Sequence, residues 1–309
     1  MKFFPISISG NKVIFFIIII ILLVVSVTLL YNPFNRVSSR EFVDSLEQPI
    51  IVESIAAPSE PDNFPLSPSS PLNKESQNQV KIAFIIDDFG DNGEGTEEMM
   101  SINRPMTFAI IPFLKYTQRD AVTAHEKGHE VIVHLPMETR KGSSIGLGSG
   151  AIRTSQTDSE IEDLVQSAIK NVPYAIGANN HMGVLASTDE RVVKSVINVL
   201  KENGLYAVDS KTTPKSIIYK VARYNDVPVL EMSLFIDNEK NKESIKKYIR
   251  QLSYVAIKRG YAIGIGHVGP LGGSNTAQAI KEMIPELESK GIKIVSISEL
   301  IRDKYDINE

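Results

Sequence analysis

Short apolar runs alternate with amphipathic stretches from residue 80 almost to the end of this 309-residue chain. The apolar runs have the length of strands, and the stretches between them have the spacing of helices with one apolar face. This repeated strand–helix order predicts an α/β fold built on a parallel sheet, for which a barrel and a doubly wound sheet are both suitable. The candidate strands are 80–86, 106–111, 130–134, 174–178, 205–208, 228–233, 261–266 and 292–296. The candidate helices are 115–127, 158–171, 189–203, 241–259 and 275–290.

The N-terminal part of the chain does not fit this pattern. Residues 13–31 carry no charge, and these 19 residues are long enough to cross a hydrocarbon core of roughly 30 Å. Lys2 and Lys12 precede the run, and no small-x-small cleavage site follows it, so we expect an uncleaved membrane anchor. Residues 1–12 are then a cytoplasmic tail, and a single-pass, N-in topology places the rest of the chain in the periplasm or extracytoplasmic space.

A second non-globular segment follows the predicted anchor. Residues 32–79 are rich in proline, serine and acidic residues and show little apolar periodicity. Such a composition predicts an extended linker that holds the folded domain away from the membrane. The folded domain is expected over 80–303, with residues 304–309 as a C-terminal tail.

Composition excludes several classes of function. The chain has no cysteine, so disulfides, thiolate zinc sites and cysteine nucleophiles are excluded, and any metal ligand must be His, Asp or Glu. The net charge of −4 comes without a basic stripe, so we expect no nucleic-acid partner. No Gly-x-Gly-x-x-Gly turn follows the first strand, so we expect no nucleotide cofactor. The Gly-x-Ser-x-Gly pattern of a serine hydrolase does not directly follow any candidate strand.

Polar side chains follow nearly every candidate strand at its C-terminal end. In parallel α/β folds these ends form one face, and that face carries the active site. Any one of these residues could simply form a capping hydrogen bond in its loop, but their repetition favours a site. The residues are Asp87, Asp88, His134, Asn180, His181, Asp209, Asp237 and His267.

The Asp87-Asp88 pair directly follows an apolar strand. Burying a carboxylate is costly, so such a pair is either kept ionised by a metal, a cation or hydrogen bonds, or forms a simple turn. A carboxylate and two or three imidazoles at one rim could hold a divalent metal with an open position for water. Glu138, four residues after His134, could be a further ligand or could orient that histidine from behind. His125 and His129 fall on the opposite face, and we interpret both as structural.

Six short motifs in order carry a resemblance to a known family: IDDFG, HLPME, NNHMG, VDS, FIDN and IGIGH. The order resembles the polysaccharide deacetylase superfamily (NodB-like domain) and more closely the divergent polysaccharide deacetylase family, over about residues 80–303. The resemblance implies a distorted (β/α) barrel of about seven mostly parallel strands. It also implies a hydrolase that removes N-acetyl or other acyl groups from a cell-envelope glycan, either peptidoglycan or another N-acetylated polysaccharide.

The resemblance further implies a role for each matched residue. Asp87 is the expected general base, Asp88 and His134 bind the metal, and His267 protonates the leaving amine. The superfamily's second metal histidine is replaced here by Glu138, and its Arg-x-Pro motif is replaced by the segment 179–183. We therefore expect His181 to supply the missing imidazole, with Glu138 nearby.

The remaining assignments concern the substrate and the ion. Asp209 is expected to orient His267 or to contact substrate, and Asn180 and Asp237 are expected to bind substrate. The expected ion is Zn²⁺, with Co, Ni or Mn as alternatives.

Two other functions stay open, and the departures of the second and third motifs from the superfamily pattern favour the first. One is a domain without turnover that acts as a glycan-binding or envelope scaffold protein. The other is a metal-dependent amidase that cleaves the peptide part of peptidoglycan.

Overall fold

The computed structural model describes residues 79–140, 147–148 and 150–307. The predicted cytoplasmic tail, the membrane span 13–31 and the linker up to residue 78 lie outside the described residues. Within the described part, no helix is long and apolar enough to cross a membrane.

The described strands form one curled sheet in which all strand pairs are parallel. Its order is β6-β5-β4-β3-β2-β1-β8-β7. β8 runs along one edge of β1, whereas β9 and β2 pair with its first and second halves. The strands are β1 (Lys81–Phe89), β2 (Thr107–Ile110), β3 (Glu130–Met137), β4 (Ala175–Met182), β5 (Tyr206–Asp209), β6 (Val229–Glu231), β7 (Leu234–Phe235), β8 (Tyr261–His267) and β9 (Lys293–Val295).

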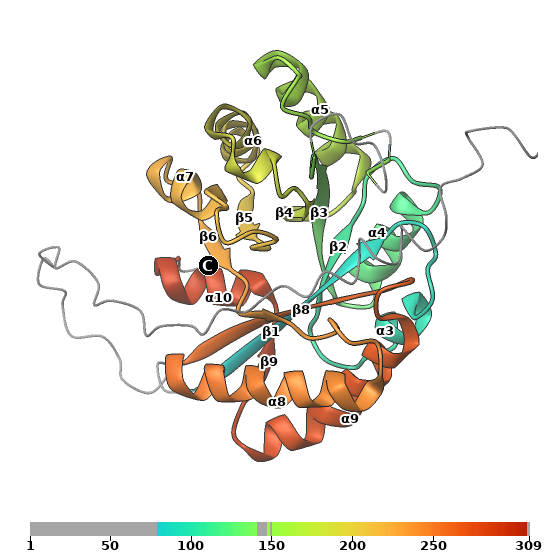
Figure 1. The fold of residues 1–309 in the computed structure, drawn as a ribbon. Helices are drawn as coiled ribbons and strands as arrows, with labels where there is room; N and C mark the ends of the chain where they lie inside the picture. The colour runs from blue at the N-terminus through green and yellow to red at the C-terminus, as the bar shows by residue number, and fades with distance from the viewer. Residues whose placement is uncertain (1–78, 141–146, 149, 308–309) are drawn as a thin grey trace, which may run out of the picture. The chain divides into compact units, whose positions relative to one another are not determined.

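Helices surround this sheet, as Figure 1 shows, with α5, α6 and α7 on one side and α8 and α9 on the opposite side. A short 3₁₀ turn, Ala186–Thr188, precedes α6. The helices are α3 (Thr96–Met100), α4 (Thr117–Glu126), α5 (Asp158–Asn171), α6 (Glu190–Glu202), α7 (Ile218–Tyr224), α8 (Lys242–Arg259), α9 (Gly273–Ser289) and α10 (Ile297–Tyr305).

Both faces of the sheet are buried, which explains why its strands are apolar throughout rather than alternating. Successive strand residues point to opposite faces. In β1, Phe84 and Ile86 therefore join the core shared with the outer helices, whereas Ile85 belongs to a second cluster inside the curl. The helix α10 contributes to that inner cluster through residues such as Leu300, so it closes the inside of the sheet.

The two edges of the sheet come close together at a seam. β6 and β7 lie at opposite ends of the strand order, yet only Met232 and Ser233 separate them in sequence. Three Cα steps span at most about 11 Å, so the curl brings these edges near each other. The Met232 N–H donates to the Asp209 carbonyl of β5, and the Ser233 N–H donates to the Ile263 carbonyl of β8.

The curled parallel sheet agrees with the predicted α/β architecture. Each of the eight candidate strands overlaps an observed strand. The sheet differs from the prediction of about seven strands because the described part contains nine, one of which is the two-residue β7. The helices α3, α7 and α10 were not predicted.

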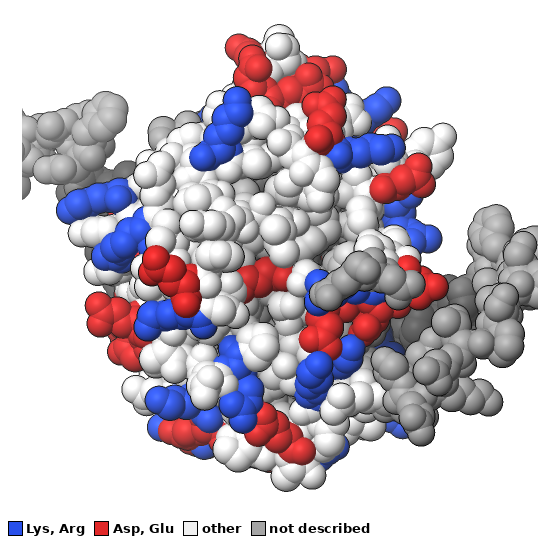
Figure 2. Space-filling model, turned by 180° about the vertical axis from the view of Figure 1, so that it is seen from behind, with Lys and Arg blue, Asp and Glu red and all other residues white. Residues whose placement is uncertain are grey.

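On the face seen in Figure 2, Lys and Arg are interspersed with Asp and Glu around an uncharged area.

Candidate functional site

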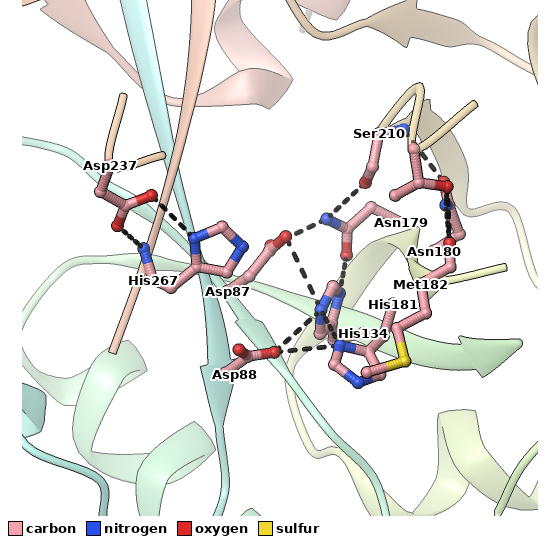
Figure 3. Close-up of polar contacts among 11 residues, drawn as sticks. Asp87, Asp88, His134, Asn179, Asn180, His181, Met182, Ser210, Asp237 and His267 are labelled. Carbon is pink, nitrogen blue, oxygen red and sulfur yellow. Dashed lines mark hydrogen bonds and ion pairs between the residues drawn. The ribbon is translucent and has the colours of Figure 1, made fainter. Parts of the chain in front are cut away.

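The C-terminal ends of the strands bring most of the predicted site residues together, as Figure 3 shows. Asp87 and Asp88 lie in the last part of β1, and His267 is the last residue of β8. In the register between these strands, Asp87 and His267 are direct neighbours. β3 contributes His134, and β4 contributes His181.

Three side chains form a compact group that could hold a metal ion: Asp88, His134 and His181. The distance from His134 Nε2 to Asp88 Oδ1 is 3.3 Å, and the distance from His181 Nδ1 to that oxygen is 3.0 Å. The two imidazole nitrogens are 3.1 Å apart. Ligand atoms of a tetrahedral zinc site, each about 2.0–2.1 Å from the ion, are separated by about 3.3 Å. The triangle therefore has nearly the size of one face of such a site.

The donor atoms themselves also fit a cation. Asp88 Oδ1 is buried and receives no well-aligned hydrogen bond from the described residues, although two imidazole nitrogens lie close to it. Burial acts to raise the pKa of Asp88, but the contacts with His134 and His181 hold that pKa well below its ordinary value. Asp88 also has a left-handed backbone with φ of 71°. Such strain in a residue other than glycine is concentrated at functional sites.

The amide of Asn179 lies between the metal group and Asp87. Its Oδ1 is 2.7 Å from His134 Nδ1. Its Nδ2 donates to Asp87 Oδ1 at 2.9 Å and to Ser210 Oγ at 3.2 Å. Asn179 is 2% exposed, and Ser210 is 1% exposed.

Asp87 is buried beside these groups. Burial raises its pKa, although the charges of His134 and His267 act to lower it. Its Oδ2 is 3.6 Å from His134 Nε2, beyond a hydrogen bond. A buried carboxylate with one oxygen held by an amide and the other facing the metal group is well placed to accept a proton from water.

His267 forms a pair with Asp237. The Nδ1 atom of His267 is 2.9 Å from Asp237 Oδ1, and its backbone N–H donates to Asp237 Oδ2 at 2.7 Å. Burial acts to lower the pKa of His267, but Asp237, with smaller contributions from Asp88 and Asp87, raises it to about 9. The imidazole is therefore protonated at neutral pH. Figure 3 shows Asp237, His267 and Asp87 in that order across the site.

Asp209 forms no hydrogen bond with His267, so it does not orient that imidazole directly. Its carboxylate accepts hydrogen bonds from the backbone N–H groups of Lys211 and Tyr219 and from Ser216. It is fully buried and holds the loop that leads into α7. The carboxylate that contacts His267 belongs to Asp237, for which the sequence predicts a role in substrate binding. The Asp237 carboxylate is already used by His267 and by the Thr276 hydroxyl.

Glu138 does not belong to the group of three potential ligands. Its Oε2 accepts hydrogen bonds from the backbone N–H and the hydroxyl of Thr154, which turns the carboxylate toward the loop after β3. The atom that contacts His134 Nδ1, the ring nitrogen outside the metal group, is Asn179 Oδ1 rather than an oxygen of Glu138.

Asn180 is 3% exposed. It links the end of β4 to the loop after β5, because it donates to the Met182 carbonyl and accepts from the Ser210 N–H.

The two remaining histidines lie apart from this group. His125 stacks on Tyr174, with ring centroids 3.9 Å apart, and His129 contacts the Met100 carbonyl through Nε2. Sequence reasoning missed Asn179 and Ser210 as site residues. Asn179 lies in the motif NNHMG, and Ser210 lies in the motif VDS. These motifs indicate the site, but they do not show which of their side chains point into it.

Comparison with known proteins agrees with this fold and with the motifs. The family model of the divergent polysaccharide deacetylases matches residues 84–301. The uncharacterized protein YibQ of Escherichia coli is 30% identical over 223 residues, which cover 72% of this chain and 68% of that protein. An uncharacterized protein of Haemophilus influenzae is 28% identical over 226 residues, which cover 73% of this chain and 78% of that one.

A solved structure shares the fold. The crystal structure of an uncharacterized protein from Agrobacterium tumefaciens has a TM-score of 0.67 and 19% sequence identity, and the match covers 74% of this chain and 92% of that one. The match of the family model over most of the described residues, together with the relative from Escherichia coli, establishes the family. This chain belongs to the divergent polysaccharide deacetylase family.

Proposed function

We propose that this protein is a metal-dependent deacetylase that removes N-acetyl or related acyl groups from a cell-envelope polysaccharide. The observation that carries the proposal is the position of the Asp88, His134 and His181 group directly beside the neighbouring pair Asp87 and His267. A potential metal site, a buried carboxylate and a protonated imidazole are the parts that amide hydrolysis requires.

Asp88, His134 and His181 would hold the ion through one oxygen and two nitrogen atoms. This donor set suits Zn²⁺, and Co, Ni and Mn are alternatives. When bound, a divalent ion at this place would polarise an acyl carbonyl and make a nearby water more acidic. As in catalytic zinc sites, which have three protein ligands, such an ion would still be able to bind water or substrate.

The two acid–base groups act on opposite ends of the reaction. Asp87 accepts a proton from the water whose oxygen forms the new bond to the acyl carbon. His267 donates its proton to the amine nitrogen as the carbon–nitrogen bond breaks, so that a free amine and a carboxylic acid are released. Asp237 supports this role because its charge stabilises the protonated form of His267.

Acetate release from N-acetylated glycans tests the proposal. The full chain, loaded in turn with Zn²⁺, Co²⁺, Ni²⁺ and Mn²⁺, is incubated with chitooligosaccharides and with peptidoglycan. We expect acetate release that falls by about 10²–10⁴-fold in Asp87→Asn. A matched control is His125→Gln, because His125 stacks on Tyr174 apart from the site.

Other outcomes identify the alternative functions. Binding of metal and glycan without acetate release, unchanged in Asp87→Asn, would show a glycan-binding scaffold domain. Peptidoglycan fragments that lose peptide rather than acetyl groups in mass spectrometry would show an amidase.

We also propose that residues 13–31 anchor the protein with its folded domain on the extracytoplasmic side of the membrane. The uncharged sequence of this segment supports the proposal. Membrane fractionation and protease treatment of intact spheroplasts test it. We expect the chain in the membrane fraction and its folded domain accessible to protease, whereas a protected domain would contradict the orientation.

A further inference from the structure

We propose that Asn179 is a positioning residue that fixes both the tautomer of His134 and the orientation of Asp87. Its effect on turnover rests on the proposed deacetylase function, but its effects on His134 and on metal affinity do not. The amide is buried at the centre of the site, and its partners come from three other parts of the sheet: β1, β3 and the loop after β5.

An amide side chain is directional, because one end only accepts hydrogen bonds and the other end only donates them. Asp87 Oδ1 lies 2.9 Å from Nδ2 of Asn179, and an ionised carboxylate can only accept, so the amide nitrogen must face it. The reversed amide would set two acceptor oxygens against each other. The Asp87 contact therefore fixes which end of the amide faces His134.

The Oδ1 end of Asn179 thus faces His134 Nδ1 at 2.7 Å. A neutral imidazole carries its proton on only one nitrogen. Asp88 Oδ1 lies 3.3 Å from Nε2 but receives no well-aligned hydrogen bond, so the closer acceptor, Asn179 Oδ1, favours the Nδ1–H tautomer. The lone pair of His134 is then on Nε2, the atom that faces Asp88 Oδ1 and His181 Nδ1. Asn179 therefore prepares His134 as a metal ligand.

The backbone makes this arrangement rigid. His134 and Asn179 are partners in the parallel register of β3 and β4, so their separation is set by the sheet rather than by a loop. Ser210 Oγ accepts the second hydrogen of Nδ2 at 3.2 Å, which prevents rotation of the amide plane. Partners of this kind, behind a metal ligand, typically contribute 10–100-fold to metal affinity or activity.

Two substitutions separate the two roles of Asn179. Asn179→Asp keeps an acceptor toward His134 but places an oxygen against the Asp87 carboxylate. Asn179→Ala removes both contacts. We expect Asn179→Asp to retain the His134 tautomer and Zn²⁺ affinity while losing acetate release, and Asn179→Ala to lose all three.

The tautomer can be read directly because the chain has only five histidines. Selective ¹⁵N-histidine labelling of the full metal-free chain, with two-bond ¹H–¹⁵N correlations at alkaline pH, distinguishes Nδ1–H from Nε2–H rings. His134 is assigned through the signal missing in His134→Gln. We expect the Nδ1–H form in the wild type and in Asn179→Asp, and a mixture richer in Nε2–H in Asn179→Ala.

Zn²⁺ affinity, measured by competition with a chromophoric chelator, supplies the second measurement. We expect a 10–100-fold loss in Asn179→Ala and less than a threefold loss in Asn179→Asp. A matched control is Asn203→Ala, since Asn203 binds Gln166 and the Val199 carbonyl at the end of α6. Circular dichroism verifies that each variant is folded.

A His134 ring in the Nε2–H form in the wild type, or wild-type Zn²⁺ affinity in Asn179→Ala, would overturn the proposal. Neither measurement uses a substrate. Failure of the deacetylase function would appear instead as absent acetate release with the tautomer and the affinity pattern intact.

Discussion

Replacing Asp237 by asparagine should lower the pKa of His267 and so destabilise the protonated imidazole. The change keeps the shape of the side chain but removes the charge 2.9 Å from His267 Nδ1. In the wild type the pKa of His267 is about 9, compared with an ordinary value of 6.5. Loss of one adjacent opposite charge typically lowers such a pKa by about 1–3 units, or about 1.4–4 kcal/mol. Burial of the ring already contributes to the wild-type value and does not change, so we expect the pKa of His267 to fall from about 9 to about 6–8 in the variant.

The pKa can be followed by NMR titration of the His267 ring in the metal-free protein. The same change has a consequence for stability. A pKa that is raised in the folded state stabilises the fold fully below pH 6.5, and this stabilisation is lost as pH rises toward 9. Denaturant unfolding should therefore show that the wild type loses stability between these pH values and that Asp237→Asn loses much less.

The matched control is Asp158→Asn, which makes the same chemical change in an exposed pair with Arg191. It should leave the His267 titration unchanged. An unaltered His267 pKa in Asp237→Asn would refute the assignment of Asp237 as the group that keeps this imidazole charged.

Three further results are expected. Gly264→Ala should destabilise the fold by about 1–3 kcal/mol in denaturant unfolding, because the new Cβ would lie 2.6 Å from Leu252 Cδ2 in a packed core. Unchanged stability would show that the Leu252 side chain of α8 can move aside. Thr157→Ala should cost about 1 kcal/mol, since Thr157 and Glu160 form a capping box at the start of α5, and an unchanged melting temperature would argue against it. Zn²⁺ at about 1,000 times its dissociation constant should stabilise the wild type by about 4 kcal/mol, and Asp88→Ala should abolish the effect; equal stabilisation of both would place the ion elsewhere.

Strand positions could be predicted from the sequence because strands buried on both faces are apolar throughout, and because polar residues begin where they end. The positions of Asp87, Asp88, His134, His181 and His267 follow from that pattern. Two-residue β7 carries too little sequence to be recognised by itself. The helix α10 packs inside the curl, an arrangement that depends on closure of the sheet.

The partners of individual carboxylates could not be predicted in this way. Asp209 and Asp237 each follow an apolar run, and only the strand order shows that Asp237 reaches His267 while Asp209 holds its own loop. Glu138 has the spacing of a ligand, but its Oε2 atom accepts hydrogen bonds from Thr154, and the residue is not part of the group of three potential ligands. Contacts between distant strands decide these cases, and spacing along the chain does not encode them.

The pairing of β1 with β8 has a consequence for how the protein matures. β1 is the first described strand in the chain, yet its neighbour β8 begins only at Tyr261, after six other strands have been synthesised. Contacts between segments so distant in sequence form slowly, because the loop must close before they contribute. The proposed base and acid are therefore carried by strands that meet only when nearly all of the domain has emerged from the ribosome. A nascent chain that ends before residue 267 would lack His267, and with it the proposed proton donor, even if its first strands had already assembled.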